Sequence, residues 1–152
     1  MGREFTNALQ QTPLWRYANR VYLPNKMLLL AWQNDNAAQV NDIIAIAYAL
    51  QQGFTLPSYW WQGDELARLR GLIGRTRRHR QQQVGPLKRT ALAFELMLEG
   101  LDIQLLQSLM VPSAPATLDL VDHYERFLDV KKGALAPLVD TLVRLPIETP
   151  PS

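Results

Sequence analysis

The stretch QVNDIIAIAYALQQG, residues 39–53, decides the fold class, because apolar side chains cover nearly every side of it once it is wound as a helix. A helix that is apolar all round belongs in the middle of a bundle, where neighbouring helices shield it from water. The positions that carry this pattern are Val40, Ile43, Ile44, Ile46, Ala47 and Leu50. We therefore expect a central helix from Gln39 to Gln52, closed by Gly53 as a left-handed cap.

Helical patterns continue on both sides of this central helix. Thr12-Pro13 predicts a helix start, since proline suits the first helical position. Amphipathic or apolar helical spacing follows at about 13–24, 27–33, 64–83, 87–110, 117–130 and 134–145. The sequence shows neither an alternating strand pattern nor an internal repeat. It predicts an all-α, single-domain bundle of about six helices over residues 13–145, with an N-terminal arm (1–12) and a flexible tail (146–152).

The composition is typical of a globular domain. The chain has 152 residues, of which 47% are hydrophobic and 20% charged, and this length suffices to bury a core. The absence of cysteine excludes disulfides, thiolate metal ligands and a cysteine nucleophile. The most apolar runs, Met27–Trp32 and Ile43–Leu50, are far shorter than the roughly 20 residues that span a bilayer. The first residues lack the apolar core of a secretory signal, so we expect a cytoplasmic protein without membrane contact.

The positive charge is concentrated in one segment, RLRGLIGRTRRHRQQQVGPLKR, residues 68–89. It holds eight of the sixteen lysines and arginines and no acidic residue, whereas the rest of the chain carries eight basic and fourteen acidic residues, a net charge of −6. Pro86 lacks an amide hydrogen and clashes with the preceding turn, so the long basic helix is expected to kink or break near this residue.

A helical wheel divides this segment into two faces. The apolar face, expected to be buried, consists of Leu66, Leu69, Leu72, Ile73, Val84 and Leu87. The opposite face, expected to be wet, carries Arg68, Arg70, Arg75, Arg77, Arg78, Lys88 and Arg89. Arg80 falls within the apolar stripe, so either the helix projects past the core there or Arg80 reaches a buried acceptor such as Asp42 or Glu95. We predict a buried or half-buried guanidinium bonded to a carboxylate or to helix carbonyls. Asn41, Asp42 and Glu95 are accordingly predicted to be structural polar residues.

Most of this segment is expected to be an ordinary solvent-exposed helix face. Its charge of one sign nevertheless indicates a macromolecular partner, because a merely solvated helix usually mixes signs. The candidate binding surface is Arg75, Arg77, Arg78, Arg80, Lys88 and Arg89. An acidic protein partner is favoured, because the sequence contains no recognisable nucleic-acid-binding motif. The alternative is a nonspecific RNA- or DNA-binding protein that uses the Arg-rich helix 68–89. A homodimer through opposed acidic and basic helices also fits the pattern, since Asp119, Asp122, Glu125 and Asp129 form an acidic face.

Signals for catalysis are weak. His123 lies four residues after Asp119, so a helix would place this carboxylate where it could orient the imidazole as a base. His79 is surrounded by arginines, which disfavour its protonated form. The sequence has no nucleophile elbow, no phosphate-binding glycine loop and no zinc or EF-hand pattern. We expect a non-enzymatic protein without catalytic residues, cofactor or metal, and keep the His123–Asp119 dyad as the distant alternative.

Parts of the sequence resemble a family of small, all-helical bacterial proteins whose shared domain has no assigned function. The opening LWRYANRVYLPNKMLLLAWQNDNAAQVN is similar to that family's LW-x-Y, LY-x-P and VN motifs, at Leu14, Trp15, Tyr17, Val21, Tyr22, Pro24, Val40 and Asn41. A V-x-PLK segment matches at Val84, Pro86, Leu87, Lys88 and Leu92, and a late helix at Leu118, Leu120, Tyr124 and Leu128. The resemblance implies an all-α fold in a bacterial cytoplasm, with Pro86 as a built-in kink, and no catalytic residues.

Overall fold

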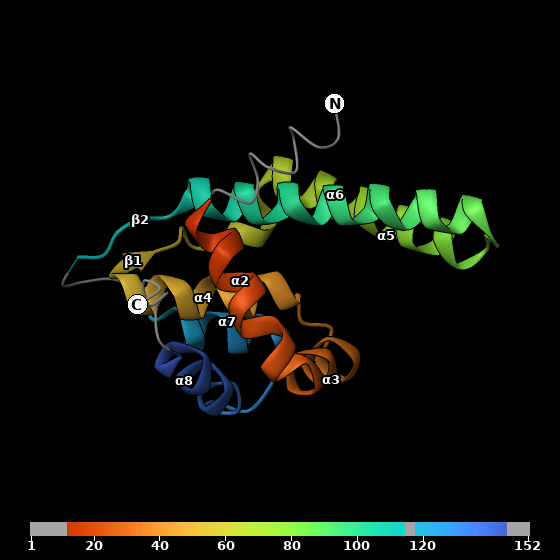
Figure 1. The fold of residues 1–152 in the computed structure, drawn as a ribbon. Coiled ribbons are helices and arrows are strands. Elements are labelled where there is room, and N and C mark those ends of the chain that lie inside the picture. The colour runs from red at the N-terminus through yellow and green to blue at the C-terminus, as the bar shows by residue number, and fades with distance from the viewer. Residues whose placement is uncertain (1–11, 115–117, 146–152) are drawn as a thin grey trace, which may run out of the picture.

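The computed structural model describes residues 12–114 and 118–145, which form an all-α bundle as predicted (Figure 1). The α-helices of this part are α2 (Pro13–Tyr22), α3 (Lys26–Asn36), α4 (Val40–Gln52), α5 (Asp64–Gln81), α6 (Pro86–Leu109), α7 (Leu120–Leu128) and α8 (Ala136–Arg144), with 3₁₀ turns η1 (Leu23–Asn25) and η2 (Trp60–Gln62). Apart from Thr12, the predicted arm and tail lie outside the described residues. None of the described helices has the length and apolar character to span a membrane.

Helix α4 lies at the centre of the bundle, as its apolar sequence predicts. Every residue from Asp42 to Ala49 is buried, and α2, α3, α6 and α8 pack around this helix. Gly53 closes α4 with a φ of 77°, and its N–H donates to the carbonyl of Ala49, as expected for a left-handed cap. The burial of Asp42 within this apolar helix means that its carboxylate needs partners from other elements.

The basic segment forms a helical hairpin. Helix α5 ends at Gln81 and α6 begins at Pro86, so the helix is broken just before the proline. The alternative of a kinked continuous helix is wrong. Figure 1 shows α5 and α6 side by side, with their connected ends extending past the rest of the bundle. Val84 and Leu87 lie at this end and are 80% and 65% exposed. Their predicted burial is wrong, because no third described element covers the end of the hairpin.

The turn between α5 and α6 depends on Gly85, which has φ 65° and ψ −139°. L-amino acids with a Cβ rarely adopt this backbone conformation. A Cβ at Gly85 would meet no atom within 4 Å, so a substitution there tests backbone strain without a steric clash. We expect Gly85→Ala to lower the free energy of unfolding by about 1–3 kcal/mol, as measured by urea denaturation.

Gly74 is the matched control for that substitution. It lies inside α5, and an added Cβ would meet only the Arg78 guanidinium at 3.6 Å. Gly74→Ala should therefore leave the protein equally stable or more stable by up to about 1 kcal/mol, because alanine favours the helix. Equal losses at both glycines would show that the Gly85 conformation is not the cause.

A small antiparallel pair of strands, β1 (Phe54–Thr55) and β2 (Val111–Pro112), joins the segment after α4 to the segment after α6. Thr55 pairs with Val111 and Phe54 with Pro112. No strand was expected from the sequence, because a strand of two residues is too short for an alternating pattern to appear. The pair ties the body-side end of α6 to the centre of the bundle, whereas the connected ends of the hairpin extend away from it (Figure 1).

Candidate binding surface

Three arginines of α5 turn toward carboxylates of α4 and α6 and form structural ion pairs. Arg70 bridges two of these carboxylates: its Nη1 and Nη2 atoms lie 2.9 and 2.6 Å from the Asp42 oxygens, and its Nε lies 2.8 Å from Oδ2 of Asp102. The Arg70 side chain is only 11% exposed. The expectation that Arg70 lies on the wet face is therefore wrong, because the wheel could not show that carboxylates from other helices face it.

Asp42 accepts further hydrogen bonds, so it is the centre of a buried polar cluster. The Trp60 indole N–H donates to it at 3.0 Å and the Tyr124 hydroxyl at 2.9 Å. Burial raises the pKa of Tyr124, and the Asp42 carboxylate raises it further, so the phenol keeps the proton that it donates. Asn41 donates to Asp102 at 3.2 Å. We call Asp42, Trp60, Arg70, Asp102 and Tyr124 the Asp42 cluster.

Arg77 and Arg80 form a second group of ion pairs with α6. The Nε atoms of both arginines contact the Glu95 carboxylate, and Arg77 also reaches Glu99 at 2.9 Å. Glu95 is 4% exposed and the Arg80 side chain 23%. The predicted half-buried Arg80 paired with a carboxylate is confirmed. Arg77, expected on the wet face, instead shares its charge with two glutamates.

The Glu95 pairing predicts a pH-dependent stability. Burial alone would raise the pKa of the Glu95 carboxyl, but the hydrogen bonds and charges of Arg80 and Arg77 outweigh it and lower the pKa below its ordinary value of 4.5. Since the folded-state pKa is the lower one, this stabilisation is complete above the ordinary value and disappears as the pH falls through the folded value. We expect Glu95→Gln to lose about 1–3 kcal/mol at pH 7.

The loss caused by Glu95→Gln should shrink toward zero in strong acid, where the wild-type carboxyl is also protonated. Urea denaturation of both proteins at a series of pH values from neutral to well below 4.5 measures this difference. Asp140→Asn, at an exposed position of α8, is the control and should show no such convergence. A Glu95→Gln deficit that stays constant down to the most acidic sample would contradict the pairing.

The remaining cations of the candidate surface are free. Arg75, Arg78, Lys88 and Arg89 are exposed and form no ion pair within residues 12–114 and 118–145. Of the six residues predicted as a binding surface, the structure thus sets Arg77 and Arg80 into ion pairs and leaves four exposed. The predicted structural polar residues Asn41, Asp42 and Glu95 all take part in the ion-paired groups.

Apolar side chains share the hairpin end with these cations. Exposed fractions there reach 80% for Val84, 65% for Leu87 and 44% for Phe94. A groove of about 410 Å³ runs between the helices, and Leu87, Ala91 and Phe94 line it together with Arg75 and His79. We call residues 72–96 the hairpin tip. It combines unpaired positive charge with uncovered apolar surface, and the sequence predicted only the charge.

The acidic helix α7 does not pair with the basic hairpin inside the molecule. The Asp119 carboxylate accepts from the Asp122 amide as a helix cap, and Asp122 pairs with Arg126. Glu125 is 2% exposed and accepts from the amides of Gly133 and Leu135. Three of the four predicted acidic-face residues therefore bind neighbouring groups of the C-terminal region.

The structure does not assemble the His123–Asp119 dyad. Asp119 is occupied by its capping bond, and the Nε2 atom of His123 accepts from the Tyr59 amide at 2.9 Å. Burial lowers the pKa of His123, and Arg126 lowers it further, which fits a neutral ring that accepts a hydrogen bond. The ring packs against Tyr59 and Trp61, with centroid distances of 4.6 and 5.0 Å. The contacts of His123 therefore hold the fold together and do not orient the imidazole as a catalytic base.

Comparisons with known proteins add no family to this picture: the chain matches no family model, no curated protein and no solved structure. The resemblance to a family of small bacterial helical proteins therefore stays a prediction. Among the described residues, no group of three or more potential metal ligands comes together.

Proposed function

We propose that the protein binds an acidic protein partner through the hairpin tip. The observation that carries this proposal is the presence of free cations and exposed apolar side chains on one projecting structure. Contiguous exposed apolar surface on a folded domain is typical of interaction sites. Burial of Val84, Leu87 and Phe94 would supply affinity, while Arg75, Arg78, Lys88 and Arg89 would steer and select a negatively charged partner.

The same observations favour a protein over a nucleic acid. A phosphate backbone is bound mainly by unpaired cations, and two of the predicted contact arginines, Arg77 and Arg80, already pair with Glu95 and Glu99. Aliphatic side chains such as Val84 and Leu87 offer no hydrogen bond to a phosphate and no ring for base stacking. An amphipathic acidic helix or loop would satisfy both the charge and the groove.

A photo-crosslinking amino acid at position 87 tests this function in cells that express the protein naturally. We expect a specific protein adduct from Leu87 and none from Met27, which is 86% exposed on α3 and serves as the matched position. A Lys88→Glu/Arg89→Glu variant should lower the yield of that adduct roughly 10-fold or more, because reversed charges repel an acidic partner.

The identity of the adduct decides between the candidate partners. An adduct whose partner is an acidic protein, and which disappears in the charge-reversal variant, supports the proposal. A nuclease-sensitive adduct, with salt-sensitive binding of labelled RNA or DNA between ~50 and ~200 mM salt, would establish the nucleic-acid alternative. An adduct with a second copy of the chain would make the hairpin tip a homodimer interface. Equal adducts from positions 87 and 27 would refute a specific surface.

A further inference from the structure

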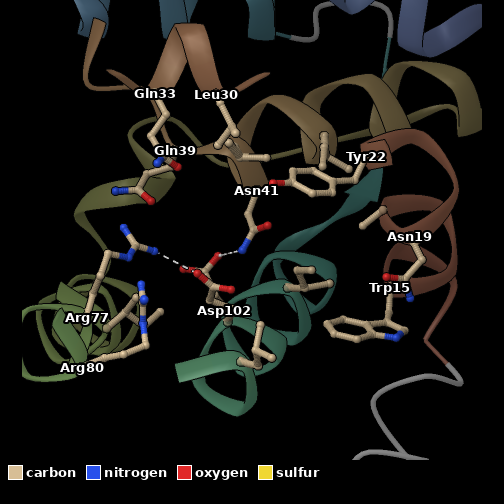
Figure 2. Close-up of a pocket in the computed structure, with 17 residues that line it drawn as sticks. Trp15, Asn19, Tyr22, Leu30, Gln33, Gln39, Asn41, Arg77, Arg80 and Asp102 are labelled. Carbon is tan, nitrogen blue, oxygen red and sulfur yellow. Dashed lines mark hydrogen bonds and ion pairs between the residues drawn. The ribbon is translucent and has the colours of Figure 1, made fainter. Parts of the chain in front are cut away.

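A separate cavity lies between the hairpin and the rest of the bundle. It has a volume of about 460 Å³ and is lined by residues of α2, α3, α4, α5 and α6 (Figure 2). This volume is within the range of small-molecule sites in proteins. The cavity is distinct from the groove at the hairpin tip, and none of the free cations Arg75, Arg78, Lys88 and Arg89 lines it.

Four charged side chains line the cavity, two of each sign. They are Arg77 and Arg80 of α5 and Glu99 and Asp102 of α6. Figure 2 shows the two arginines on one side of the cavity, with Asp102 beside them. Asp102 is held by hydrogen bonds from Arg70 and Asn41. The other three charged side chains keep hydrogen-bonding atoms that a ligand could use.

The two arginines keep unused donors at the cavity. Arg80 contacts Glu95 through Nε, and its two Nη atoms have no partner in the part of the chain that the structure describes. Arg77 uses Nε on Glu95 and Nη2 on Glu99, which leaves Nη1. A guanidinium carries five N–H groups. A ligand carboxylate could therefore accept hydrogen bonds from both arginines while their ion pairs with Glu95 stay intact.

Glu99 keeps one carboxylate oxygen for a positive group. Its Oε1 accepts from Arg77 at 2.9 Å, and its Oε2 has no hydrogen-bond partner among residues 12–114 and 118–145. The side chain is 34% exposed, so a ligand can reach it. Burial raises the pKa of this carboxyl above its ordinary value of 4.5; Arg77 opposes the rise, and Glu95 and Asp102 add to it. An ammonium group beside Glu99 would stabilise the charged carboxylate.

The charge balance around the cavity disfavours a ligand that is only an anion. The ion-paired groups comprise three arginines and four carboxylates, a formal excess of one negative charge: Arg70, Arg77 and Arg80 against Asp42, Asp102, Glu95 and Glu99. A lone carboxylate would add to this excess, and a lone ammonium group would face two guanidiniums. A zwitterion carries one charge of each sign and avoids both penalties.

Aliphatic side chains border these charged groups. Ile73 lies four residues before Arg77 on α5, so the two side chains are neighbours on one face of the helix. Ile103 lies four residues after Glu99 on α6, in the same relation. Both isoleucines are buried and line the cavity together with Ile44 of α4. A ligand whose charged groups face Arg77 and Glu99 therefore has an apolar wall next to it.

We infer that this cavity binds a free α-amino acid with an apolar side chain. The carboxylate of the ligand accepts from the free Nη atoms of Arg77 and Arg80, and its ammonium group donates to Glu99. The Arg77–Glu99 contact of 2.9 Å places the donors and the acceptor of the protein next to each other. This arrangement matches the carboxylate and ammonium groups that an amino acid carries on one carbon atom. The aliphatic wall covers the side chain of the ligand.

Titration of the full chain with L-leucine and L-phenylalanine, followed by two-dimensional ¹H–¹⁵N NMR, tests this inference. We expect saturable shifts of the backbone amide signals of Ile73 and Ile103. Isocaproate is leucine without the amino group, and isopentylamine is leucine without the carboxylate. Each should bind roughly tenfold more weakly than leucine, because each leaves a charged group of the protein without a partner. Glycine, which lacks the apolar side chain, should also bind more weakly.

Three variants assign the binding to the charged side chains. Arg80→Lys removes the free Nη donors but keeps a cation for Glu95, and it should weaken leucine binding roughly tenfold. Arg78→Lys, at an exposed position of α5 outside the cavity, is the matched control and should leave binding unchanged. Glu99→Gln removes the charge that attracts the ammonium group and repels an acid, so isocaproate should bind this variant as tightly as leucine does. Thermal melts check that each variant is folded.

Weaker binding of both analogues and of glycine, with the loss of selectivity in Glu99→Gln, supports an amino-acid site. Isocaproate or isopentylamine binding the unmodified chain as tightly as leucine would overturn it. Shifts that spare Ile73 and Ile103, or no shift with either amino acid at millimolar concentration, would also overturn it. Reversal of Lys88 and Arg89 should leave the leucine titration unchanged, so the amino-acid site and the proposed protein partner can fail independently.

Discussion

Replacement of Asp42 by alanine is expected to lower the free energy of unfolding by about 3–5 kcal/mol. The carboxylate is fully buried and receives hydrogen bonds from Arg70, Trp60 and Tyr124. Its removal leaves a buried guanidinium with half of its counter-charge and leaves two buried donors without a partner. This loss is a large share of the roughly 5–15 kcal/mol that stabilises a typical domain.

Urea denaturation of Asp42→Ala, Asp42→Asn and Asp35→Ala separates the causes of that loss. Asp42→Asn keeps the size of the side chain and part of its hydrogen bonding, so its loss should be intermediate. Asp35 is exposed on α3, and its removal should change stability by less than about 0.5 kcal/mol. A loss below about 1 kcal/mol for Asp42→Ala would contradict the central place of this carboxylate in the fold.

The sequence predicted the parts of the fold that depend on local periodicity. Helix α4 was predicted to be central because nearly all its positions are apolar, and a helix that is apolar on every side is buried. Pro86 and Gly53 marked real boundaries because their backbone restrictions act within the local chain. The two-residue strand pair escaped prediction, since Phe54–Thr55 and Val111–Pro112 are joined by pairing and have no local pattern.

The ion pairs between side chains of different helices could not be predicted from the sequence. A helical wheel shows which residues of one helix share a face, but it does not show which side chains of other helices lie opposite that face. Arg70 pairs with Asp42, which is 28 residues away in the sequence. Arg80 was recognised only because it was placed within the apolar stripe, whereas Arg70 and Arg77 were assigned to the opposite face together with the other cations. Their acidic partners on α4 and α6 explain why the part of α5 from Arg68 onward, which holds its arginines, needs no acidic residues of its own.

The exposed apolar residues of the hairpin tip were misassigned for a related reason. Periodicity places Val84 and Leu87 on the same face as Leu66 and Ile73, and burial was inferred from the shared face. Leu66 and Ile73 are buried, whereas Val84 and Leu87 belong to the connected ends of α5 and α6, which extend past the rest of the bundle (Figure 1). Whether a stripe is covered depends on how far neighbouring helices reach, which is a tertiary property.

Arg70→Met is the second substitution with a large expected effect, a loss of about 3–5 kcal/mol in the free energy of unfolding. Burial lowers the pKa of the Arg70 guanidinium, but Asp42 and Asp102 outweigh it and raise the pKa, so the arginine is held as a cation between them. Its replacement leaves two buried carboxylates close together without a counter-charge. Each of them then lacks the charged hydrogen bonds that offset its removal from water.

Two arginine variants show whether charge alone or the shape of the guanidinium stabilises this site. Arg70→Lys keeps the charge but cannot place two N–H groups on Asp42 and a third on Asp102, so equilibrium denaturation should give a loss between zero and that of Arg70→Met. Arg68→Met removes an exposed arginine from the same helix and should cost less than about 0.5 kcal/mol. If Arg70→Met proved no more harmful than Arg68→Met, the ion pairs of Arg70 would not be what anchors the hairpin to the bundle.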